Sequence, residues 1–483
     1  MNVKELAKVL PDVLSISGDT DVEINSVAYD SRKVKDNGIF VAISGTNFDG
    51  HDFIPEAIKG GAKVIIGEKE MDIGNILYIR VKDARKALAR TSAWFYGYPG
   101  DKLKIIGVTG TSGKTTITYL ISEMLKEVGC RFGVIGTIGN VINGRKLPAS
   151  LTTPESLELN RLFAEMLEHN TEYAVMEVSS HSLKLNRVTG LSFEVGIFTN
   201  LTQDHLDFHK DFDDYFLSKK KLFQQSEKAV INIDDKSGAK LLGMIDIPVL
   251  TYGVKGDADV KAKNIEITAE GAFYELVFNG GTYPVYFGTP GLFSVYNSLA
   301  AITTGIAMGF PLNSLIRAVG NVKGIPGRFE LIKNNQDIYV IIDYAHKPDG
   351  LKNVLLTIKE FCSGKIITVF GCGGDRDRDK RPIMGQISSQ LSDYTIITSD
   401  NPRSEDPEVI IKEIEKGIIG NDYEKISDRR KAIKRAISMA NKGDVVLIAG
   451  KGHEDYQVLR DRTIHFDDKE IAKEYLRKIV EDL

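Results

Sequence analysis

The sequence predicts an α/β protein of three domains, built on parallel sheets that carry helices. Its 483 residues exceed what one hydrophobic core usually holds, because single cores stop growing beyond roughly 250–300 residues. Short apolar segments alternate with stretches of helical periodicity, which is the order that builds parallel sheets. Near residue 104, a strand-like segment passes through a glycine-rich loop into a helix-like segment. This segment is therefore predicted to bind phosphate.

Composition narrows the classes of function. A net charge of −4 gives no electrostatic reason to expect a nucleic-acid partner. Cys130, Cys362 and Cys372 are widely spaced and form no CxxC pair, which favours a reducing cytoplasm over a disulfide framework or a zinc site. Neither a signal-like apolar core nor an apolar run of about 18 residues is present, so no membrane insertion is expected. We expect the protein to be cytoplasmic and monomeric.

Residues 1–98 predict a small α/β domain. Strands are expected at 24–29, 38–43, 62–67 and 76–81, and helices at 55–60 and 84–96. Two loops, 30–32 and 44–51, are rich in hydroxyl, amide and glycine groups. Such loops either bind a polar ligand or form ordinary turns, which favour the same residue types.

The phosphate-binding segment opens the second region. A short apolar strand that starts at Lys104 leads into a loop with glycines at 107, 110 and 113, and apolar residues from Ile117 to Val128 recur with helical spacing. Backbone N–H groups and the positive helix end suit phosphate. Lys114 would neutralise the β- and γ-phosphates, and the Thr115 hydroxyl would hold Mg²⁺. Val108 stands where the general P-loop pattern has glycine, but both flanks fit the motif.

Polar side chains follow the later strands of this region. Strands at 132–137, 173–177 and 193–200 and a helix at 157–170 are expected. Glu177 ends one strand beside the loop, which suits a ligand of Mg²⁺. His205 lies just past the next strand, either as a metal or phosphate ligand or as a structural residue. Asn297 precedes a helix expected at 298–308, as a cap or facing a nucleotide, and Lys220 and Lys221 are expected on a solvated helix face.

The third region, from about residue 327, predicts a doubly wound, Rossmann-like parallel sheet. Strands are expected at 338–342, 365–370, 394–398 and 444–449, with helices at 382–391, 408–417 and 429–440. Each strand runs into a charged loop, at 343–346, 371–377, 399–403 and 450–454. Because parallel strands end at one edge of a sheet, these loops predict a second ligand site.

These motifs together resemble a known family. Residues 109–116 resemble the signature of the Mur ligases, and residues 177–181, 200–207, 343–346 and 400–403 are similar to those of the MurE type. The resemblance covers all three domains, with a UDP-sugar-binding domain at 1–98, a P-loop ATPase-like domain at 99–326 and an amino-acid-binding domain at 327–483. It implies an ATP-dependent ligase of peptidoglycan precursor synthesis. In that reaction the γ-carboxylate of D-Glu in UDP-MurNAc-L-Ala-D-Glu becomes an acyl phosphate, which an amine attacks.

The resemblance also implies roles for individual residues. Lys114, Glu177, His205 and Lys219 would be catalytic, and Thr115, Glu177, His205 and Lys219 would bind Mg²⁺, with Lys219 carbamylated so that it carries a carboxylate-like group. ATP would be bound by Gly110, Thr111, Ser112, Gly113, Lys114, Thr115, Thr116, Asn297, Arg328 and Asp343. The UDP-sugar would be bound by Ser31, Thr46, Asn47 and Phe48. The muramoyl peptide would be bound by Thr152, Thr153, Ser179 and Arg187. Leu185 stands where the family usually has glutamine.

The incoming amino acid would meet residues of the C-terminal loops: Arg381, Asp400, Asn401, Pro402, Arg403, Gly450 and Glu454. In the family the sequence Asp-Asn-Pro-Arg accompanies meso-diaminopimelate, which carries a carboxylate and an ammonium at its far end. Arg403 offers a bidentate partner for that carboxylate, and Glu454 can pair with the ammonium. L-Lysine is the alternative substrate. It would leave Arg403 unpaired at a cost of about 1–3 kcal/mol.

Overall fold

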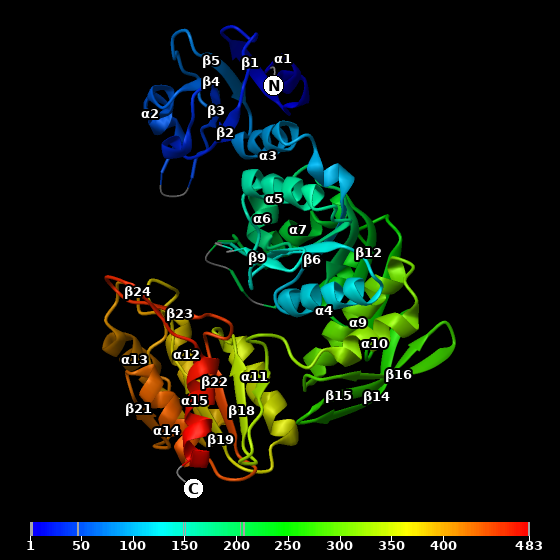
Figure 1. Ribbon diagram of the computed structural model, residues 1–483, viewed down its shortest axis with the longest axis vertical. Helices are drawn as coiled ribbons and strands as arrows, with labels where there is room; N and C mark the ends of the chain where they lie inside the picture. The colour runs from blue at the N-terminus through cyan, green and yellow to red at the C-terminus, as the bar shows by residue number, and fades with distance from the viewer. Residues whose placement is uncertain are drawn as a thin grey trace. The chain divides into compact units, whose positions relative to one another are not determined.

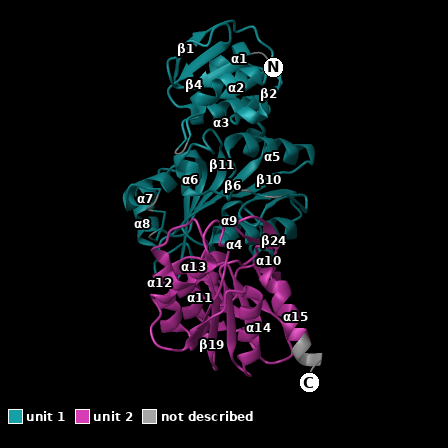
Figure 2. Ribbon diagram, turned by 90° about the vertical axis from the view of Figure 1, so that its left-hand side faces the viewer, with its two compact units in different colours: residues 1–261, 299–315 teal, residues 262–298, 316–483 magenta. Residues whose placement is uncertain are grey.

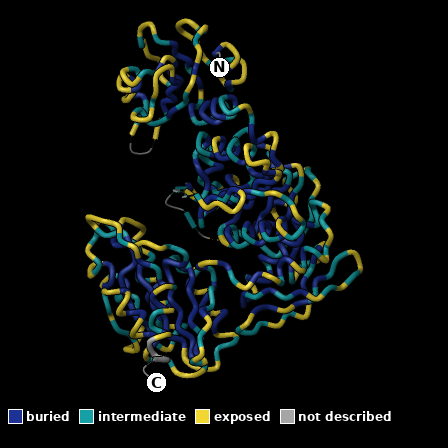
Figure 3. The backbone as a smooth tube through the Cα atoms, viewed as in Figure 1, coloured by how far each residue is buried: buried dark blue, intermediate teal, exposed yellow. Residues whose placement is uncertain are grey.

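The computed structural model describes residues 3–45, 48–147, 149, 151–202, 204–205 and 208–481. The chain divides into two compact units, coloured separately in Figure 2: residues 1–261 with 299–315, and residues 262–298 with 316–483. Figure 3 shows that the strands at the centre of each sheet are buried while many connecting loops are exposed. No helix of the described residues has the length and apolar character needed to cross a membrane.

The N-terminal part of the first unit is a five-stranded sheet in the order β1-β5-β4-β3-β2, parallel except for β1 against β5. Its strands are β1 (Val13–Ser17), β2 (Ser26–Ala28), β3 (Gly38–Val41), β4 (Ala62–Gly67) and β5 (Leu77–Val81). Its helices are α1 (Val3–Val9), α2 (Ile54–Lys59) and α3 (Ala84–Phe95). Buried clusters on the two faces explain why the central strands β3 and β4 are almost entirely apolar.

The rest of the first unit is built around β6, which is labelled in Figure 1. Its strands lie in the order β13-β12-β11-β6-β10-β7-β8-β9. Its strands are β6 (Lys104–Thr109), β7 (Phe132–Ile135), β8 (Asn140–Ile142), β9 (Arg145–Leu147), β10 (Tyr173–Glu177), β11 (Phe193–Phe198), β12 (Ser226–Asn232) and β13 (Val249–Gly253). Its helices are α4 (Lys114–Glu127), α5 (Ser156–Glu168), α6 (Ser180–Lys184), α7 (Phe212–Lys220), α8 (Lys236–Leu242) and most of α9 (Leu292–Ala307), and α10 (Leu312–Asn321) begins here. Because β7, β10, β6, β11 and β12 are parallel, their carboxyl ends meet at one edge.

The glycine-rich loop after β6 needs glycine for two reasons. Gly110 and Gly113 have φ of +151° and +88°, values that side chains rarely adopt. A Cβ atom on Gly110 would also lie 1.8 Å from Thr199 Oγ1. The loop is therefore compressed against the end of β11, and α4 begins at once at Lys114.

The second unit contains the strands β14 (Val260–Thr268, which begins in the first unit), β15 (Gly271–Phe278) and β16 (Gly281–Phe287), and a six-stranded sheet. The sheet has the order β17-β18-β22-β19-β20-β21, parallel except for β17 against β18. Its strands are β17 (Glu330–Ile332), β18 (Tyr339–Asp343), β19 (Ile366–Phe370), β20 (Tyr394–Ile397), β21 (Tyr423–Lys425) and β22 (Val445–Ala449). A hairpin of β23 (Tyr456–Val458) and β24 (Thr463–His465) follows.

Helices cover both faces of this six-stranded sheet. The buried cluster on one face includes residues of α11 (Pro348–Phe361), α12 (Lys380–Leu391) and α13 (Pro407–Glu415). The cluster on the other face includes residues of α14 (Arg429–Met439) and α15 (Asp468–Glu481). This is the predicted doubly wound arrangement.

Two expectations from the sequence are wrong. Asn297 does not cap a helix, because α9 already begins at Leu292 and Asn297 lies buried inside it. Lys221 is not on a solvated face. Its Nζ donates to Leu183 O at 3.4 Å, and burial lowers the pKa of its ammonium.

Candidate functional site

The glycine loop after β6 is held closely by its surroundings. Lys114 Nζ donates to the backbone oxygens of Gly110 (2.8 Å) and Thr111 (2.9 Å), so this cation lies over the loop. The end of β11 fixes the loop from the other side, since Thr199 Oγ1 donates to Ser112 O at 2.7 Å and Asn200 Oδ1 accepts from Ser112 N at 3.0 Å. The result is a rigid loop that carries an ammonium group at a helix N-terminus, as anion binding requires.

Glu177 and Thr115 meet beside this loop. Thr115 Oγ1 donates to Glu177 Oε1 at 3.0 Å. Thr137, at the end of β7, donates to the same carboxylate from its backbone N (2.8 Å) and its Oγ1 (3.2 Å). These contacts follow from the pairing of β6, β10 and β7, which brings their carboxyl ends together. The buried carboxylate and the hydroxyl are oxygen ligands of the kind that Mg²⁺ prefers.

A second polar group extends from Glu177 along the same edge. Thr153 Oγ1 donates to Glu177 O at 2.8 Å and accepts from Ser179 N at 3.1 Å. Arg187 NH1 donates to Thr153 O at 3.1 Å, while Arg187 Nε lies 2.8 Å from Glu155 Oε1. Thr152 Oγ1 is 3.1 Å from Thr137 Oγ1. All four residues predicted at the muramoyl peptide are therefore linked to the Glu177 group.

Lys219 is buried against the glycine loop. Its side chain is only 1% exposed, and Nζ donates to Gly110 O at 2.9 Å. Nζ also lies 4.5 Å from the centre of the Tyr215 ring, and the Tyr215 hydroxyl is 3.1 Å from Thr111 Oγ1. Lys219 and Lys114 thus both donate to Gly110 O.

His205 has a strained backbone and an acidic neighbour. Its φ is +54°, which is uncommon for a residue with a side chain. Its Nε2 is 3.3 Å from Asp204 Oδ2, and its ring packs edge-on against His181 with centroids 4.7 Å apart. Asp207, the other flanking acid, lies outside the described residues. Among the residues that the structure describes, no group of three or more His, Cys, Asp and Glu side chains is placed to hold a metal by itself.

The loops of the N-terminal sheet show features of ordinary turns. Asp30 and Asp49 cap the short 3₁₀ helices Ser31–Lys33 and Gly50–Phe53, and Ser31 Oγ donates to Glu56 Oε2 at 2.7 Å. Phe48 is 75% exposed. The predicted residues Thr46 and Asn47 lie outside the described residues.

The residues predicted to bind nucleotide in the second unit are Asn297, Arg328 and Asp343. Asp343 ends β18, and its Oδ2 accepts from Phe329 N at 2.7 Å. Burial raises the pKa of this carboxyl, with the nearby Arg328 acting in the opposite direction. The Arg328 guanidinium lies 4.8 Å from the centre of the Tyr344 ring. Arg328 and Asp343 are therefore neighbours, whereas Lys114 belongs to the other unit.

The four charged loops of the C-terminal sheet do converge. Asn401 Nδ2 and Lys451 Nζ each donate to Glu454 Oε2 at 2.9 Å. Gly450 has a φ of +115°, a value that favours glycine, and a Cβ atom there would lie 2.7 Å from Asp400 Oδ2. Asp400, Asn401, Gly450 and Glu454 thus form one cluster at the sheet edge, as predicted.

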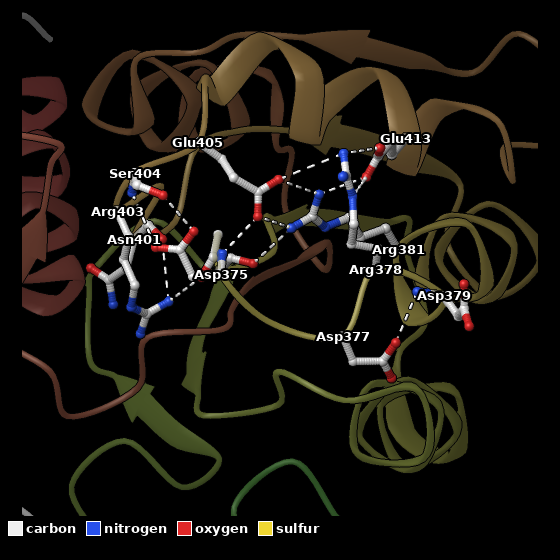
Figure 4. Close-up of polar contacts among 12 residues, drawn as sticks. Asp375, Asp377, Arg378, Asp379, Arg381, Asn401, Arg403, Ser404, Glu405 and Glu413 are labelled. Carbon is white, nitrogen blue, oxygen red and sulfur yellow. Dashed lines mark hydrogen bonds and ion pairs between the residues drawn. The ribbon is translucent and has the colours of Figure 1, made fainter. Parts of the chain in front are cut away.

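Arg381 and Arg403 lie in one polar network (Figure 4). Arg381 is fully buried. Its NH1 and NH2 donate to Glu405 at 2.9 and 2.8 Å, and NH1 also donates to Glu413 at 2.6 Å. This pairing holds the pKa of the Glu405 carboxyl at about 2. Arg403 NH1 donates to Gly374 O at 2.8 Å.

The structure adds residues that sequence reasoning missed. Thr137 is bonded to Glu177, Tyr215 to the glycine loop, Lys451 to Glu454, and Glu405 to Arg381. Thr137 had a signal, because it is the last residue of a strand predicted in the same region. No such signal marked Glu405 or Tyr215, because a single acidic or aromatic residue in a helix or loop forms no periodic pattern.

The chain is similar to known protein families and to individual proteins along most of its length. Three family models match: "Mur ligase family, catalytic domain" over residues 23–96, "Mur ligase middle domain" over 108–305, and "Mur ligase, glutamate ligase domain" over 327–452. The chain is 48% identical to UDP-N-acetylmuramoyl-L-alanyl-D-glutamate–2,6-diaminopimelate ligase 1 of Clostridium acetobutylicum, covering 98% of this chain and 100% of that protein. It is also 48% identical to the corresponding ligase of Clostridium tetani, covering 99% and 100%.

A solved structure of such a diaminopimelate ligase is similar along its whole length. It matches with a TM-score of 0.73 at 34% identity, covering 99% of each chain. This match, with the three family models, confirms the predicted α/β fold in N-terminal, central and C-terminal domains.

Proposed function

The chain belongs to the Mur ligase family, and on that basis we propose that it joins meso-diaminopimelate to the γ-carboxylate of D-Glu in UDP-MurNAc-L-Ala-D-Glu. It is an ATP-dependent, ADP-forming ligase, as members of this family are. The reaction belongs to peptidoglycan precursor synthesis, and we place it in the cytoplasm. L-Lysine is not the favoured amino acid, because the relatives described above are named for diaminopimelate.

One observation carries the choice of amino acid. Asp400, Asn401, Arg403 and Glu454 extend from loops at one edge of the C-terminal sheet, and Glu454 bonds Asn401 at 2.9 Å. A guanidinium can pair with the distal carboxylate of diaminopimelate, and carboxylates can pair with its ammonium. Gly450 and Pro402 belong to the loops of this cluster. Arg381 is also proposed to meet the amino acid, and its charge is held by Glu405 and Glu413.

The glycine loop supports ATP binding in the first unit. In this proposal Gly110–Thr116 bind the phosphates, and Lys114 neutralises their charge at the helix N-terminus. Asn297, Arg328 and Asp343 contact the rest of the nucleotide. Stabilising charge on a transferring phosphoryl group is the main task of such a site.

Thr115 and Glu177 fit a magnesium ion. Their oxygens are 3.0 Å apart, and Mg²⁺ is usually held by one or two protein oxygens together with phosphate oxygens and water. A bound Mg²⁺ would neutralise charge on the phosphates. His205 and a carbamylated Lys219 are proposed for a second ion. The burial of Lys219 against Gly110 O sets it apart from Lys220 and Lys221.

The nucleotide substrate would bind along the first unit. Ser31, Thr46, Asn47 and Phe48 are proposed for the UDP-sugar, and Thr152, Thr153, Ser179 and Arg187 for the peptide. The latter four are bonded to the group around Glu177, which would bring the D-Glu carboxylate towards the phosphate-binding loop. Excluding water there protects the acyl phosphate until the amine attacks.

The proposed domain boundaries are 1–98, 99–326 and 327–483, and the proposed assembly is a monomer. Each of the three family matches falls inside one of these ranges. Limited proteolysis should cut first near residues 98 and 326, with the mass of each fragment measured, and sedimentation should give the mass of one chain.

The function is tested by phosphate release from ATP in the presence of Mg²⁺ and UDP-MurNAc-L-Ala-D-Glu. Release should require that nucleotide and be much faster with meso-diaminopimelate than with L-lysine. Arg403→Ala should raise KM for meso-diaminopimelate about tenfold or more, since a charged pair is lost, and leave KM for ATP unchanged. Arg430→Ala, on the exposed face of α14, is the control. Faster release with lysine would overturn the choice of amino acid, and release without either substrate would indicate an ATPase.

A further inference from the structure

Two loops of the C-terminal domain are interlocked around Arg403 (Figure 4). One loop follows β19 and contains Gly373, Gly374 and Asp375, and the other follows β20 and contains residues 401–405. Gly374 N donates to Asn401 O at 2.9 Å, and Asp375 N donates to Glu405 Oε1 at 2.6 Å. A Cβ atom on Gly374 would lie 1.9 Å from Pro402 O. The loops therefore touch backbone to backbone.

Arg403 and Asp375 both have left-handed backbones. Their φ values are +52° and +54°, which costs of order 1 kcal/mol or more for a residue with a side chain. Such a conformation persists where the surroundings hold it. Arg403 N donates to Val458 O at 3.1 Å, and its NH1 donates to Gly374 O at 2.8 Å.

The next residue, Ser404, is held by Asp375. The Asp375 carboxylate accepts from Ser404 Oγ at 2.6 Å and from Ser404 N at 3.2 Å. These bonds lower the pKa of the Asp375 carboxyl, so it is ionised at neutral pH. Asp375 thus fixes the peptide that follows Arg403. The loop that contains Asp375 also supplies Gly374 O, the oxygen that accepts the hydrogen bond from the Arg403 guanidinium.

We propose that Asp375 is a positioning residue that sets amino-acid selectivity by holding Arg403 through Ser404. The inference rests on the proposed function, in which Arg403 pairs with the distal carboxylate of the amino acid. Bidentate pairing needs two N–H groups in one plane at a fixed place, and a guanidinium on a long side chain reaches that state only when its loop is fixed. Removing the bond from Asp375 to Ser404 lets the peptide after Arg403 move, so the carboxylate of diaminopimelate is held less well.

The experiment measures kcat/KM for meso-diaminopimelate and for L-lysine in Asp375→Asn, Ser404→Ala and the double variant. Each single variant should lower the ratio of the two values about three- to tenfold, as expected for one or two lost hydrogen bonds, with KM for ATP unchanged. The double variant should lose little more than the larger single effect, because both substitutions weaken the same pairing of Asp375 with Ser404. Asp379→Asn removes an exposed charge four residues along the same segment and should keep the wild-type ratio.

Three results would overturn the inference. An unchanged ratio in Asp375→Asn would show that the carboxylate does not act on selectivity. A lower ratio in Asp375→Asn but not in Ser404→Ala would show that charge, rather than position, is responsible. Additive losses in the double variant would show that the two residues act separately. If the wild-type protein itself does not prefer meso-diaminopimelate, the proposed function fails first, so the two failures are distinguishable.

Discussion

His346 shows how burial fixes the state of one residue at the C-terminal sheet edge. It lies just past β18, and its Nδ1 is 2.7 Å from Tyr344 O. Burial, reinforced by the nearby Lys347, lowers the pKa of the imidazole to about 3. The ring is therefore neutral at pH 7 and donates from Nδ1 to the carbonyl oxygen. A neutral imidazole suits this site, because the positive charges of Lys380 and Arg328 nearby disfavour a protonated ring.

The sign of the resulting pH dependence follows from linkage. An unfolded histidine has a pKa of about 6.5, so below that pH the unfolded chain binds a proton that the folded chain does not, and stability falls as pH falls. Between pH 7 and pH 5 this single group should cost about 2 kcal/mol. His346→Asn keeps a donor for Tyr344 O without titrating, so it should lose about that much less stability over the same range.

The measurement is hydrogen exchange of peptides from β18 and α11 at pH 7 and pH 5, corrected for intrinsic rates. His465→Asn is the control, because His465 is exposed and Glu470 raises the pKa of its imidazole, so its titration does not favour acid unfolding. Equal acid sensitivity in His346→Asn and in the wild type would show that His346 is protonated in the folded protein.

At the scale of elements, the edge where β7 and β10 end should control the proposed Mg²⁺ site. Gly136 follows β7, and a Cβ atom there would lie 2.5 Å from Glu177 Oε1. Gly136 is not among the positive-φ glycines, so the backbone tolerates alanine and Glu177 has to move. Gly136→Ala should therefore raise the Mg²⁺ concentration needed for half-maximal activity about tenfold, as a loss of about 1.4 kcal/mol in binding would do.

Gly129 is the matched control for that substitution. It has a φ of +76° at the end of α4, and a Cβ atom there meets nothing within 4 Å. Gly129→Ala should cost about 1 kcal/mol of stability, from strain at the helix terminus, and leave the Mg²⁺ dependence unchanged. If both variants changed only thermal stability, the edge would not govern metal binding.

Elements with strong periodicity and buried surroundings could be predicted. The strands β4 and β10 were predicted with the observed bounds, because every residue of β10 and all but one of β4 are buried and the segments are therefore apolar. β1 was missed, since its residues are mostly exposed and show no clear alternation. α11 was missed although Leu351, Val354, Leu355 and Ile358 have helical spacing, because Pro348 and the polar residues before it are typical of a loop.

The site residues also divide into those that could be placed from the sequence and those that could not. Loops that end parallel strands could be placed at one edge from the sequence alone, and Asn401 and Glu454 do meet there. The partners of Arg381 could not be predicted. Glu405 and Glu413 come from positions 24 and 32 residues away, and acidic residues near the start and end of a helix are ordinary. Which carboxylate meets a given arginine depends on helix packing that the sequence pattern does not encode.

At the scale of the whole molecule, the proposed amino-acid site lies within one contiguous stretch. Arg381, Asp400, Asn401, Arg403 and Glu454 all belong to residues 327–483, the stretch that also contains the six-stranded sheet with buried clusters on both faces. A stretch of this length is typical of an independent domain. We expect it to fold when expressed alone.

Contacts with residues that precede the stretch would be lost, such as the bond from Arg328 N to Ile325 O. Phe293 packs against Phe329 with ring centroids 6.1 Å apart, and such a pair contributes of order 1 kcal/mol. The fragment should therefore be less stable than the same region in the full chain but still unfold cooperatively. Its amino-acid site should remain complete, because the bonds that join Asn401, Lys451 and Glu454 are internal to it.

Thermal unfolding of the 327–483 fragment tests whether the fragment folds alone and whether its amino-acid site is complete. A ligand at about ten times its Kd stabilises a folded domain by about 1.4 kcal/mol, which corresponds to a rise in Tm of roughly 3–5 °C for a domain of this size. Saturating meso-diaminopimelate should give that rise and L-lysine a much smaller one. Arg403→Ala in the fragment should abolish the difference. A folded fragment that responds to neither amino acid would show that the site needs residues from elsewhere in the chain, and an unfolded fragment would contradict the proposed boundary at 327.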